Sequence, residues 1–400
     1  LGKIESQGID PAGQMYFTEE YVSNLKQSLE TGERRSLRSR RNKRYVSGKG
    51  LYDRYVSDIC ESTDTVKSLV DKLERQNICV TEMVMRTLLA DCALKLLVSS
   101  GEITVDREIF PAYIDGSLTI GVWSALIDDI IQDKKAALSW ANNNKNLMDT
   151  NYYYQKGEDV LGLLYMSIRD AGSRKAAGSY YTPTKVVRTL ISDVTGDMGS
   201  RISEGGKRLF DPCCGTGNFL IQLPDDIELN NIYACDIDEL SVQLARFNLA
   251  LGRLSGRRHV NVDEAIWTIY EHIERRDFIS EYRNDSECGG DDKKLLADPG
   301  YDIIIGNPPW GYTFDRETRT LLRKAYRTAA GRGVESSDVF VECALKLLTD
   351  EGVLAFVLPE ALLDVHNHKT IREIIAESAN VSRVSFLGCL LYTSPSPRDR

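Results

Sequence analysis

The sequence predicts an α/β protein in which a doubly wound, mostly parallel β-sheet follows a mainly helical N-terminal domain. From Leu209 onward, short and almost continuously apolar runs alternate with amphipathic helical patterns. This alternation is typical of parallel strands that are buried on both faces. Two of the runs end in loops rich in glycine or proline, and open sheets of this kind bind ligands at the carboxyl ends of their strands.

The bulk composition limits the classes of protein that remain. The chain has 400 residues, of which 42% are hydrophobic, so it is long enough for two or three domains. A net charge of −9 excludes a wholly basic nucleic-acid binder, although a local basic face is still enough to bind DNA. No apolar run is long enough for a membrane span, so no membrane partner is expected. Nine cysteines without a CxxC pair predict no zinc site and no disulfide framework, and reduced thiols favour a cytoplasmic protein.

Residues 1–150 are predicted to form the mainly helical N-terminal region. Three segments have apolar residues at helical spacing, namely 64–75, 81–98 and 123–139. The run 34–44 is densely basic and has two readings, a solvated charged stretch or an arm that contacts phosphates. The sequence begins at Leu1 without an initiator Met, so we expect a chain that is truncated at its N-terminus. Residues 141–150 are polar and predict the domain boundary.

Residues 151–388 are predicted to form the second domain. An amphipathic helix is expected from Asp159 to Tyr165, and Thr182-Pro183 predicts the start of another, with threonine as N-cap. Strands are expected at 208–210, 231–236, between 264 and 276, 301–305, 353–358 and 381–387. Helices are expected at 240–251, 338–348, where Ser337-Asp338 would form the cap, and 371–378.

A glycine loop follows the first strand. Asp211-Pro-Cys-Cys-Gly-Thr-Gly-Asn-Phe-Leu220 turns on Gly215 and Gly217 into a helix start. Glycine permits positive φ and lets a ligand lie against the backbone. The spacing is not GxGxxG and no GKS or GKT is present, so the ligand need not be a polyphosphate.

Acidic residues follow the next two strands. Asp236 ends the second strand, where a carboxylate can accept hydrogen bonds from both hydroxyls of a ribose. Asp277 and Phe278 follow the third strand and could bond an adenine amino group and stack on its ring. Together with the glycine loop, these residues predict a nucleoside cofactor.

The fourth strand ends in Asn307-Pro-Pro-Trp310. Two prolines cannot continue a central strand, so they set a rigid turn that holds an amide and an aromatic ring at the sheet edge. Together with the glycine loop, Asp236, Asp277-Phe278 and the upstream Tyr180-Tyr-Thr-Pro183, this motif resembles the motif series of amino-methyltransferases acting on adenine N6 in DNA. The order resembles the subgroup of type I modification subunits and fused restriction–modification enzymes, over roughly residues 155–388.

The resemblance implies a Rossmann-like methyltransferase sheet, S-adenosylmethionine as cofactor, double-stranded DNA as substrate and a specificity or restriction subunit as candidate partner. It also implies roles for individual residues. Tyr181, Thr182 and Pro183 would line the methionine end of the cofactor together with Asp211, Cys213, Gly215 and Gly217, Asp236 would bind the ribose, Asp277 and Phe278 would hold the adenine, and Asn307, Pro308, Pro309 and Trp310 would form the catalytic motif.

The chemistry of the proline motif supports this reading independently. An exocyclic aromatic amine is a poor nucleophile because its lone pair is delocalised into the ring. The Asn307 side-chain oxygen and the Pro308 carbonyl could accept hydrogen bonds from the two N–H groups of the amine and aim its lone pair at the methyl donor. Trp310 would stack on the target base after it has been flipped out of the duplex.

Other readings stay open. Asn-Pro-Pro-aromatic motifs also act in the methylation of a protein glutamine amide or an RNA guanine amine, which is a second hypothesis. A non-catalytic DNA-binding subunit is a third. Among the residues, Phe278 could be a core aromatic, Cys213 and Cys214 are expected to be small packing residues, and His366 and His368 are expected to lie exposed in a loop.

Two departures from the family pattern are visible. Pro224 follows Gly217 closely and predicts a short helix after the glycine loop. Family members carry a target-reading domain after the core, and we expect none here because the pattern stops near Leu387. Residues 389–400 break the pattern and are expected to be a non-native tail.

Overall fold

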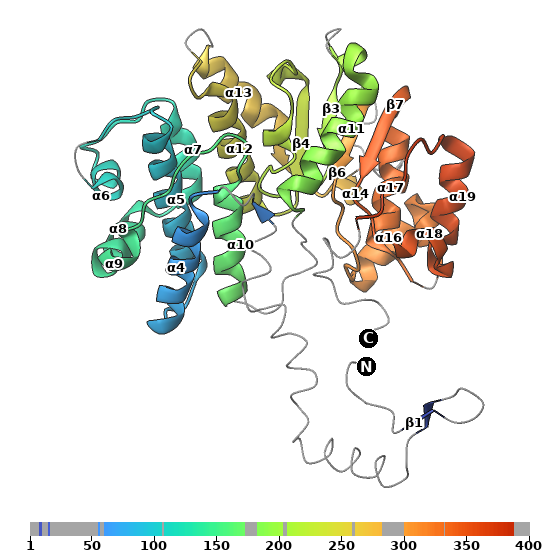
Figure 1. Cartoon of the computed structure of the whole chain (residues 1–400), viewed down its shortest axis with the longest axis horizontal. Coiled ribbons are helices and arrows are strands. Elements are labelled where there is room, and N and C mark those ends of the chain that lie inside the picture. Colours follow the sequence, from blue (N-terminus) through green and yellow to red (C-terminus); the bar gives the residue numbers. More distant parts are fainter. Residues whose placement is uncertain are drawn as a thin grey trace. The chain divides into compact units, whose positions relative to one another are not determined.

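The protein is described here from a computed structural model (Figure 1). It describes residues 8–9, 15–16, 55–56, 60–105, 108–172, 182–202, 206–257, 261–281, 300–331 and 333–387. Residues 52–390 form one compact unit, and the remaining residues form a second unit. In that second unit β1 (Gly8–Ile9) pairs antiparallel with β2 (Met15–Tyr16). The basic run 34–44, Tyr181 and the tail 389–400 lie outside the described residues.

The larger unit contains a five-stranded sheet in which every neighbouring pair is parallel. Its strands are β3 (Leu209–Asp211), β4 (Ile232–Asp236), β5 (Ile273–Arg275), β6 (Tyr301–Gly306) and β7 (Leu348–Phe356). Their order in space is β5-β4-β3-β6-β7, so the chain moves outward to one side of β3 and then returns to build the other side. This topology confirms the predicted doubly wound parallel sheet.

Helices cover both faces of the sheet (Figure 1). Phe210, Cys235, Tyr301 and Ile304 point into a core that α14, α16 and α17 complete, while α12 packs against β4 and β5. The helices of the sheet domain are α10 (Val160–Gly172), α11 (Thr184–Ile202), α12 (Glu239–Leu254), α13 (Val262–His272), α14 (Phe278–Glu281), α16 (Arg316–Ala325), α17 (Ser336–Leu347), α18 (Ala361–Asp364) and α19 (Lys369–Ser378). Single 3₁₀ turns are η1 (Leu220–Gln222), η2 (Leu229–Asn231), η3 (Arg327–Ala329) and η4 (His366–His368).

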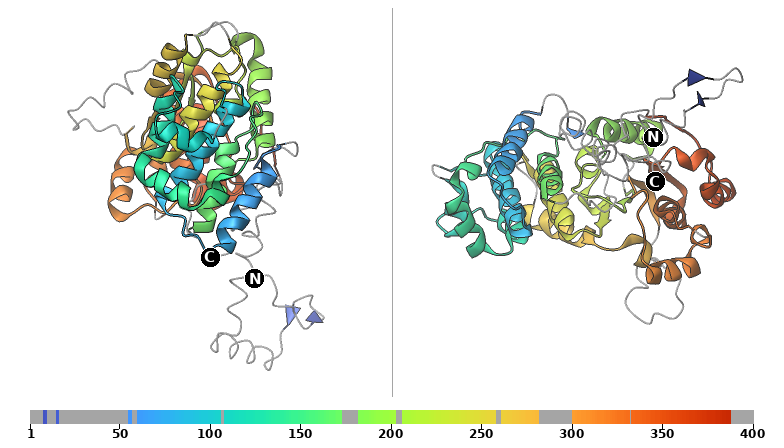
Figure 2. Two further views of the ribbon diagram at one scale, coloured as in Figure 1. Left: turned by 90° about the vertical axis from the view of Figure 1, so that its left-hand side faces the viewer. Right: turned by 90° about the horizontal axis from the view of Figure 1, so that it is seen from below.

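The described residues before the sheet, from 60 to 148, are mainly helical: the predicted segments 64–75 and 81–98 each form one helix, whereas 123–139 is divided between two. This part of the chain contains α4 (Thr63–Arg75), α5 (Glu82–Ser99), α6 (Ile109–Ile114), α7 (Trp123–Ile131), α8 (Lys134–Asn143) and α9 (Lys145–Met148). Helix α5 is buried on almost all sides because it packs against α7, α8 and α10, and α7 packs in turn on α12. These helices are grouped beside the sheet in the views of Figure 2. The boundary near residue 150 stays a prediction.

The structure corrects three predicted elements. Residues 381–387 form no strand; Val381 and Phe386 are 65% and 71% exposed, and without a ladder partner an apolar run does not become a strand. Helix α11 begins one residue later than expected, because the Pro183 carbonyl accepts the first helical hydrogen bonds. Helix α17 is preceded by Glu335, so Ser337 and Asp338 lie inside its first turn.

The glycine loop leads only into the 3₁₀ turn η1, which agrees with the short helix predicted from Pro224. Among the described helices, none combines the length and apolarity that a membrane span requires.

Candidate active site

The glycine loop and the Asn-Pro-Pro-Trp turn leave the same edge of the sheet on adjacent strands. Strands β3 and β6 are parallel neighbours, with Leu209 opposite Ile303 and Phe210 opposite Ile304. The order of the strands reverses between them, and such a switch point opens a crevice at the carboxyl edge.

Gly306 brings the two loops into direct contact. A Cβ atom added at Gly306 would lie 2.8 Å from Oδ1 of Asp211 and 3.2 Å from Sγ of Cys213. The residue before Asn307 therefore packs against the first carboxylate of the glycine loop, and a side chain at this position would separate the two motifs.

Backbone hydrogen bonds hold the glycine loop against β4. The Gly215 N–H donates to Oδ2 of Asp236 at 2.9 Å, and the Cys214 N–H donates to the Cys235 carbonyl at 3.0 Å. Gly215 and Gly217 have φ angles of 53° and 89°, which side-chain-bearing residues rarely adopt. A Cβ at Gly217 would also lie 3.1 Å from the Ala245 Cα, so the loop lies close against α12.

Two carboxyl groups flank this loop. Asp211 is fully buried and accepts the Cys213 N–H at 3.1 Å through Oδ1, whereas Oδ2 has no hydrogen-bond partner among the described residues. Burial raises the pKa of Asp211 to about 8, and the nearby charge of Asp236 adds to the rise. Burial also raises the pKa of Asp236, which accepts the N–H groups of Gly215 and Asp238 at 2.9 Å. The ion pairs next to this strand end involve the following acids instead, Asp238 with Arg169 and Glu239 with Arg275.

The Asn-Pro-Pro-Trp turn is held from α17 and β7. Ser336 is fully buried; its hydroxyl donates to the Pro309 carbonyl at 2.6 Å and accepts the Tyr312 N–H at 3.3 Å. The indole N–H of Trp310 donates to the Val357 carbonyl at 3.2 Å. Asn307 and Trp310 are half-buried, so Trp310 is not a core residue, and its ring orientation is fixed by the indole bond.

The stretch Thr182-Pro183 contacts the glycine loop. Asn218 donates its side-chain amide to the Thr182 carbonyl at 2.9 Å, and the Thr184 hydroxyl donates to the Asn218 amide oxygen at 3.3 Å. Thr182 is buried and Pro183 is half-buried. The structure therefore brings these two predicted residues beside the loop from a distant part of the sequence.

Asp277 and Phe278 lie at the start of α14. The Phe278 ring is 2% exposed and packs between Phe210 and Phe340, with ring centroids 5.6 and 5.3 Å away. Because it is enclosed in the core, this ring does not offer a face for stacking, which corrects that expectation and favours the reading of a core aromatic. Asp277 is half-buried and accepts the Ser280 N–H at 3.4 Å.

The thiols near the loop are packing groups. Burial raises the pKa of Cys213 and of Cys214 well above the usual value, and the charges of Asp211 and Asp236 act in the same direction. Both are therefore neutral thiols, in agreement with the predicted small-residue role.

One histidine was misplaced by the sequence reading. His366 is exposed, as expected, but His368 is only 5% exposed and its Nδ1 lies 2.6 Å from Oδ1 of the buried Asp338. Burial disfavours the charged ring, yet the hydrogen bond and charge of Asp338 outweigh it and raise the pKa of His368. The two residues are 30 positions apart, so no local pattern indicates the pair.

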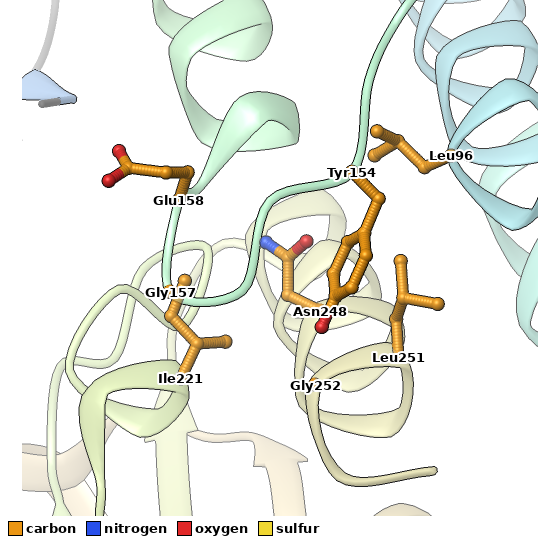
Figure 3. A pocket seen from close by; sticks show the side chains of 8 residues that line it. All are labelled: Leu96, Tyr154, Gly157, Glu158, Ile221, Asn248, Leu251 and Gly252. Atoms are coloured by element: carbon orange, nitrogen blue, oxygen red, sulfur yellow. The ribbon is translucent and has the colours of Figure 1, made fainter. Parts of the chain in front are cut away.

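Two cavities lie outside the residues assigned to the candidate site. A cavity of about 20 Å³ lies among Leu96, Tyr154, Gly157, Glu158, Ile221, Asn248, Leu251 and Gly252 (Figure 3). This volume suffices for a single water molecule. A larger one of about 310 Å³ lies between the loop 225–230 and α13, where the strands begin.

A doubly wound parallel sheet with these two loops at its switch point defines the class of fold, a Rossmann-like α/β sheet. Residues 230–388 match the family described as Eco57I restriction-modification methylase. This match covers the strands from β4 onward and the Asn-Pro-Pro-Trp turn, and it agrees with the resemblance drawn from the motifs.

Three curated relatives are similar to this chain. The type II methyltransferase M.VspI of Vibrio sp. (strain 343) is 26% identical over 71% of this chain and 61% of its own length. The methylase subunit of the Escherichia coli type I restriction enzyme EcoEI is 24% identical over 60% of this chain and 44% of its own length. The adenine-specific methyltransferase PglX of Streptomyces coelicolor is 24% identical over 44% of this chain and 18% of its own length. The chain thus spans less than two thirds of each relative.

Among solved structures, the DrdV–DNA complex matches with a TM-score of 0.50 and 17% identity, covering 88% of this chain and 35% of that one. This match supports the same fold.

Proposed function

We propose that this protein transfers a methyl group from S-adenosylmethionine to the N6 amine of adenine in double-stranded DNA, within a restriction–modification or phage-defence system. The observation that carries the proposal is the contact of Gly306 with Asp211, which joins the cofactor loop to the Asn-Pro-Pro-Trp turn. The relatives M.VspI and PglX, named a methyltransferase and an adenine-specific methyltransferase, support the reaction and the target base.

The residues of the glycine loop fit a cofactor with a cationic amino-acid end. Asp211 has a buried oxygen with no hydrogen-bond partner among the described residues, and Asp236 lies close enough for its charge to raise the pKa of Asp211. An ammonium group would satisfy the Asp211 oxygen, and ribose hydroxyls would suit Asp236. We assign Asp211, Cys213, Gly215, Gly217, Thr182 and Pro183 to the methionine end, with Tyr181 as a further candidate, and Asp236 and Asp277 to the nucleoside.

The catalytic work of the chain itself is positioning. When bound, S-adenosylmethionine supplies an electrophilic methyl group. The Asn307 side-chain oxygen and the Pro308 carbonyl accept hydrogen bonds from the two N–H groups of the adenine amine. These fixed dipoles stabilise the positive charge that develops on nitrogen. Ser336 donates its hydrogen bond to the carbonyl of Pro309, and this anchoring contact therefore does not involve the Pro308 carbonyl that accepts from the amine. Trp310, held by Val357, stacks on the flipped base.

Labelled S-adenosylmethionine tests the proposal directly. The protein, together with its natural C-terminal extension where one exists, is incubated with duplex DNA that contains all four bases, and the DNA is digested to nucleosides. We expect the label in N6-methyl-deoxyadenosine. Label in a cytosine nucleoside would refute the adenine assignment, and so would label found only in parallel reactions that offer RNA or a glutamine-containing protein instead of DNA. DNA binding without any methyl transfer would favour the non-catalytic subunit instead.

A specificity or restriction subunit is the partner we propose. Adding this subunit should raise the rate of methyl transfer on its own target sequence.

The raised pKa of Asp211 predicts a pH dependence of cofactor binding. The free protein carries mostly neutral Asp211 at pH 7, whereas an ammonium group binds the ionised form. Affinity for S-adenosylmethionine should therefore rise with pH through about 8, by roughly tenfold per unit below that value. Isothermal titration between pH 6 and 8.5 measures the slope, and Asp211→Asn should bind weakly with no such slope.

The raised pKa of Asp211 has the opposite effect on the stability of the free protein: stability falls as pH rises, whereas cofactor affinity increases. A carboxyl whose folded pKa lies above its unfolded value stabilises the fold at low pH, and this contribution is lost as pH rises through about 8. Asp211→Asn should therefore raise the melting temperature of the free protein at pH 8. A lower melting temperature together with an unchanged binding slope would contradict the assignment.

A further inference from the structure

A buried carboxylate lies directly beneath the glycine loop, at a position that the motif analysis did not use. Asp159 is fully buried and precedes the first residue of α10. Four donors from four separate parts of the chain converge on it. They are the Tyr55 hydroxyl at 2.5 Å, the Thr216 hydroxyl at 2.5 Å, the Gly162 N–H at 2.7 Å and the Asn248 side-chain amide at 2.7 Å.

The donor pattern favours the ionised form of Asp159. Tyr55 and Thr216 donate to Oδ2, and Gly162 and Asn248 donate to Oδ1, so each oxygen accepts two hydrogen bonds. Burial raises the pKa of this carboxyl, while the bonds from its donors oppose the rise. A negative charge with full hydrogen bonding is therefore held inside the protein next to a loop that we assign to the cofactor.

Thr216 is the part of the glycine loop that faces this carboxylate. It lies between Gly215 and Gly217, is only 1% exposed, and directs its hydroxyl toward Asp159. Its carbonyl also accepts the Asn248 amide at 2.9 Å. Thr216 thus fixes the loop through both its side chain and its backbone.

The first turn of α10 is shaped for the same contact. A Cβ added at Gly162 would lie 2.1 Å from Oδ2 of Asp159 and 2.4 Å from the Thr216 hydroxyl oxygen, closer than any real contact. Asn248, on α12, also lines the 20 Å³ cavity in Figure 3, so the network borders a space that holds no more than a water molecule.

We propose that Asp159 is a positioning residue that holds the glycine loop, through Thr216, in the conformation that receives the cofactor. The carboxylate is fully buried, so it acts on the ligand only through the loop. Through Tyr55 it also connects the N-terminal helical region to the loop. The inference rests on the proposed function in that it takes the loop as the cofactor site.

Substitutions of Thr216 distinguish the hydrogen bond to Asp159 from general packing. Thr216→Val keeps the size of the side chain but removes the hydroxyl, and should raise the Kd for S-adenosylmethionine about tenfold, as expected for the loss of a hydrogen bond to a charged group. Thr216→Ser keeps the hydroxyl and should bind within about twofold of the wild type. The kcat at saturating cofactor should change little in either variant, because the catalytic turn is untouched.

Asp159→Asn and the double variant complete a thermodynamic cycle. Asp159→Asn should also weaken binding, and adding Thr216→Val to it should cause little further loss, because both changes break the same contact. Asp91→Asn is the matched control, since Asp91 is a buried helical carboxyl that bonds Lys95 at 2.6 Å, on α5. It should lower the melting temperature and leave the Kd unchanged. A Kd unaffected by Thr216→Val, or raised equally by Asp91→Asn, would overturn the proposal.

A measurement without cofactor keeps this test separate from the proposed function. Hydrogen exchange of the peptide 211–223 should be at least about threefold faster in Thr216→Val and Asp159→Asn than in the wild type, Thr216→Ser or Asp91→Asn. Unchanged exchange in the first two variants would refute the positioning role. If the wild type binds the cofactor but methylates no adenine, the proposed function fails while the binding and exchange results still decide the role of Asp159.

Discussion

Asn307→Ala should reduce the kcat for methyl transfer by roughly 10²–10³-fold, the usual cost of losing one preorganised dipole at a developing charge. Alanine leaves the turn in place, because Ser336 still bonds the Pro309 carbonyl and Trp310 still bonds Val357. The acceptor for one N–H of the amine is lost. Affinity for S-adenosylmethionine should stay within about twofold, since Asn307 contributes no group to the proposed cofactor contacts.

Single-turnover transfer of labelled methyl groups measures the rate, and titration measures the binding. Asn261→Ala is a suitable control because Asn261 caps α13, accepting the Glu264 N–H at 3.4 Å, away from the crevice. It should cost about 1 kcal/mol of stability and leave the rate unchanged. A rate for Asn307→Ala within threefold of the wild type would remove Asn307 from the mechanism.

Gly306→Ala should lower kcat by about 10²-fold through geometry alone. The new Cβ would lie 2.8 Å from Oδ1 of Asp211, so either the buried carboxyl or the Asn307 turn must move. Displacement of a reacting group by about 1 Å costs a factor of this size. Because Asp211 lies at the cofactor loop, the KM for S-adenosylmethionine should rise as well.

The matched control is Gly252→Ala on α12, where an added Cβ meets nothing within 4 Å. This change should stabilise the helix by about 0.5–1 kcal/mol and leave both kinetic parameters unchanged. Full activity of Gly306→Ala would show that the two loops do not need their direct contact. The contact of Gly306 with Asp211 would then no longer support the proposed function.

The main elements of the sheet could be predicted because their patterns are local. The strands 232–236 and 301–306 were predicted to within one residue, since nearly continuous apolar runs bounded by turn residues favour buried parallel strands. Residues 381–387 have a similar apolar content, and that prediction was wrong. A strand needs a neighbour to complete its hydrogen bonds, and no sequence pattern states whether an edge will be available.

The site was predictable where glycine and proline restrict the backbone. The positive φ of Gly215 and Gly217 and the turn at Pro308-Pro309 follow from residue type, so the two loops could be recognised before their positions were known. Phe278 shows the limit of this reasoning. Its place after a strand suggested a ligand contact, but the side of the backbone on which α14 packs turns the ring into the core.

By itself the sequence determined the class of fold, the two loops and the kind of chemistry they carry, because these depend on residue type and on spacing along the chain. Only the tertiary structure decided that Gly306 rests on Asp211, that Asp159 supports Thr216, and that His368 is buried against Asp338. These contacts join residues from different elements, and their energies depend on burial and packing that arise only when the elements come together.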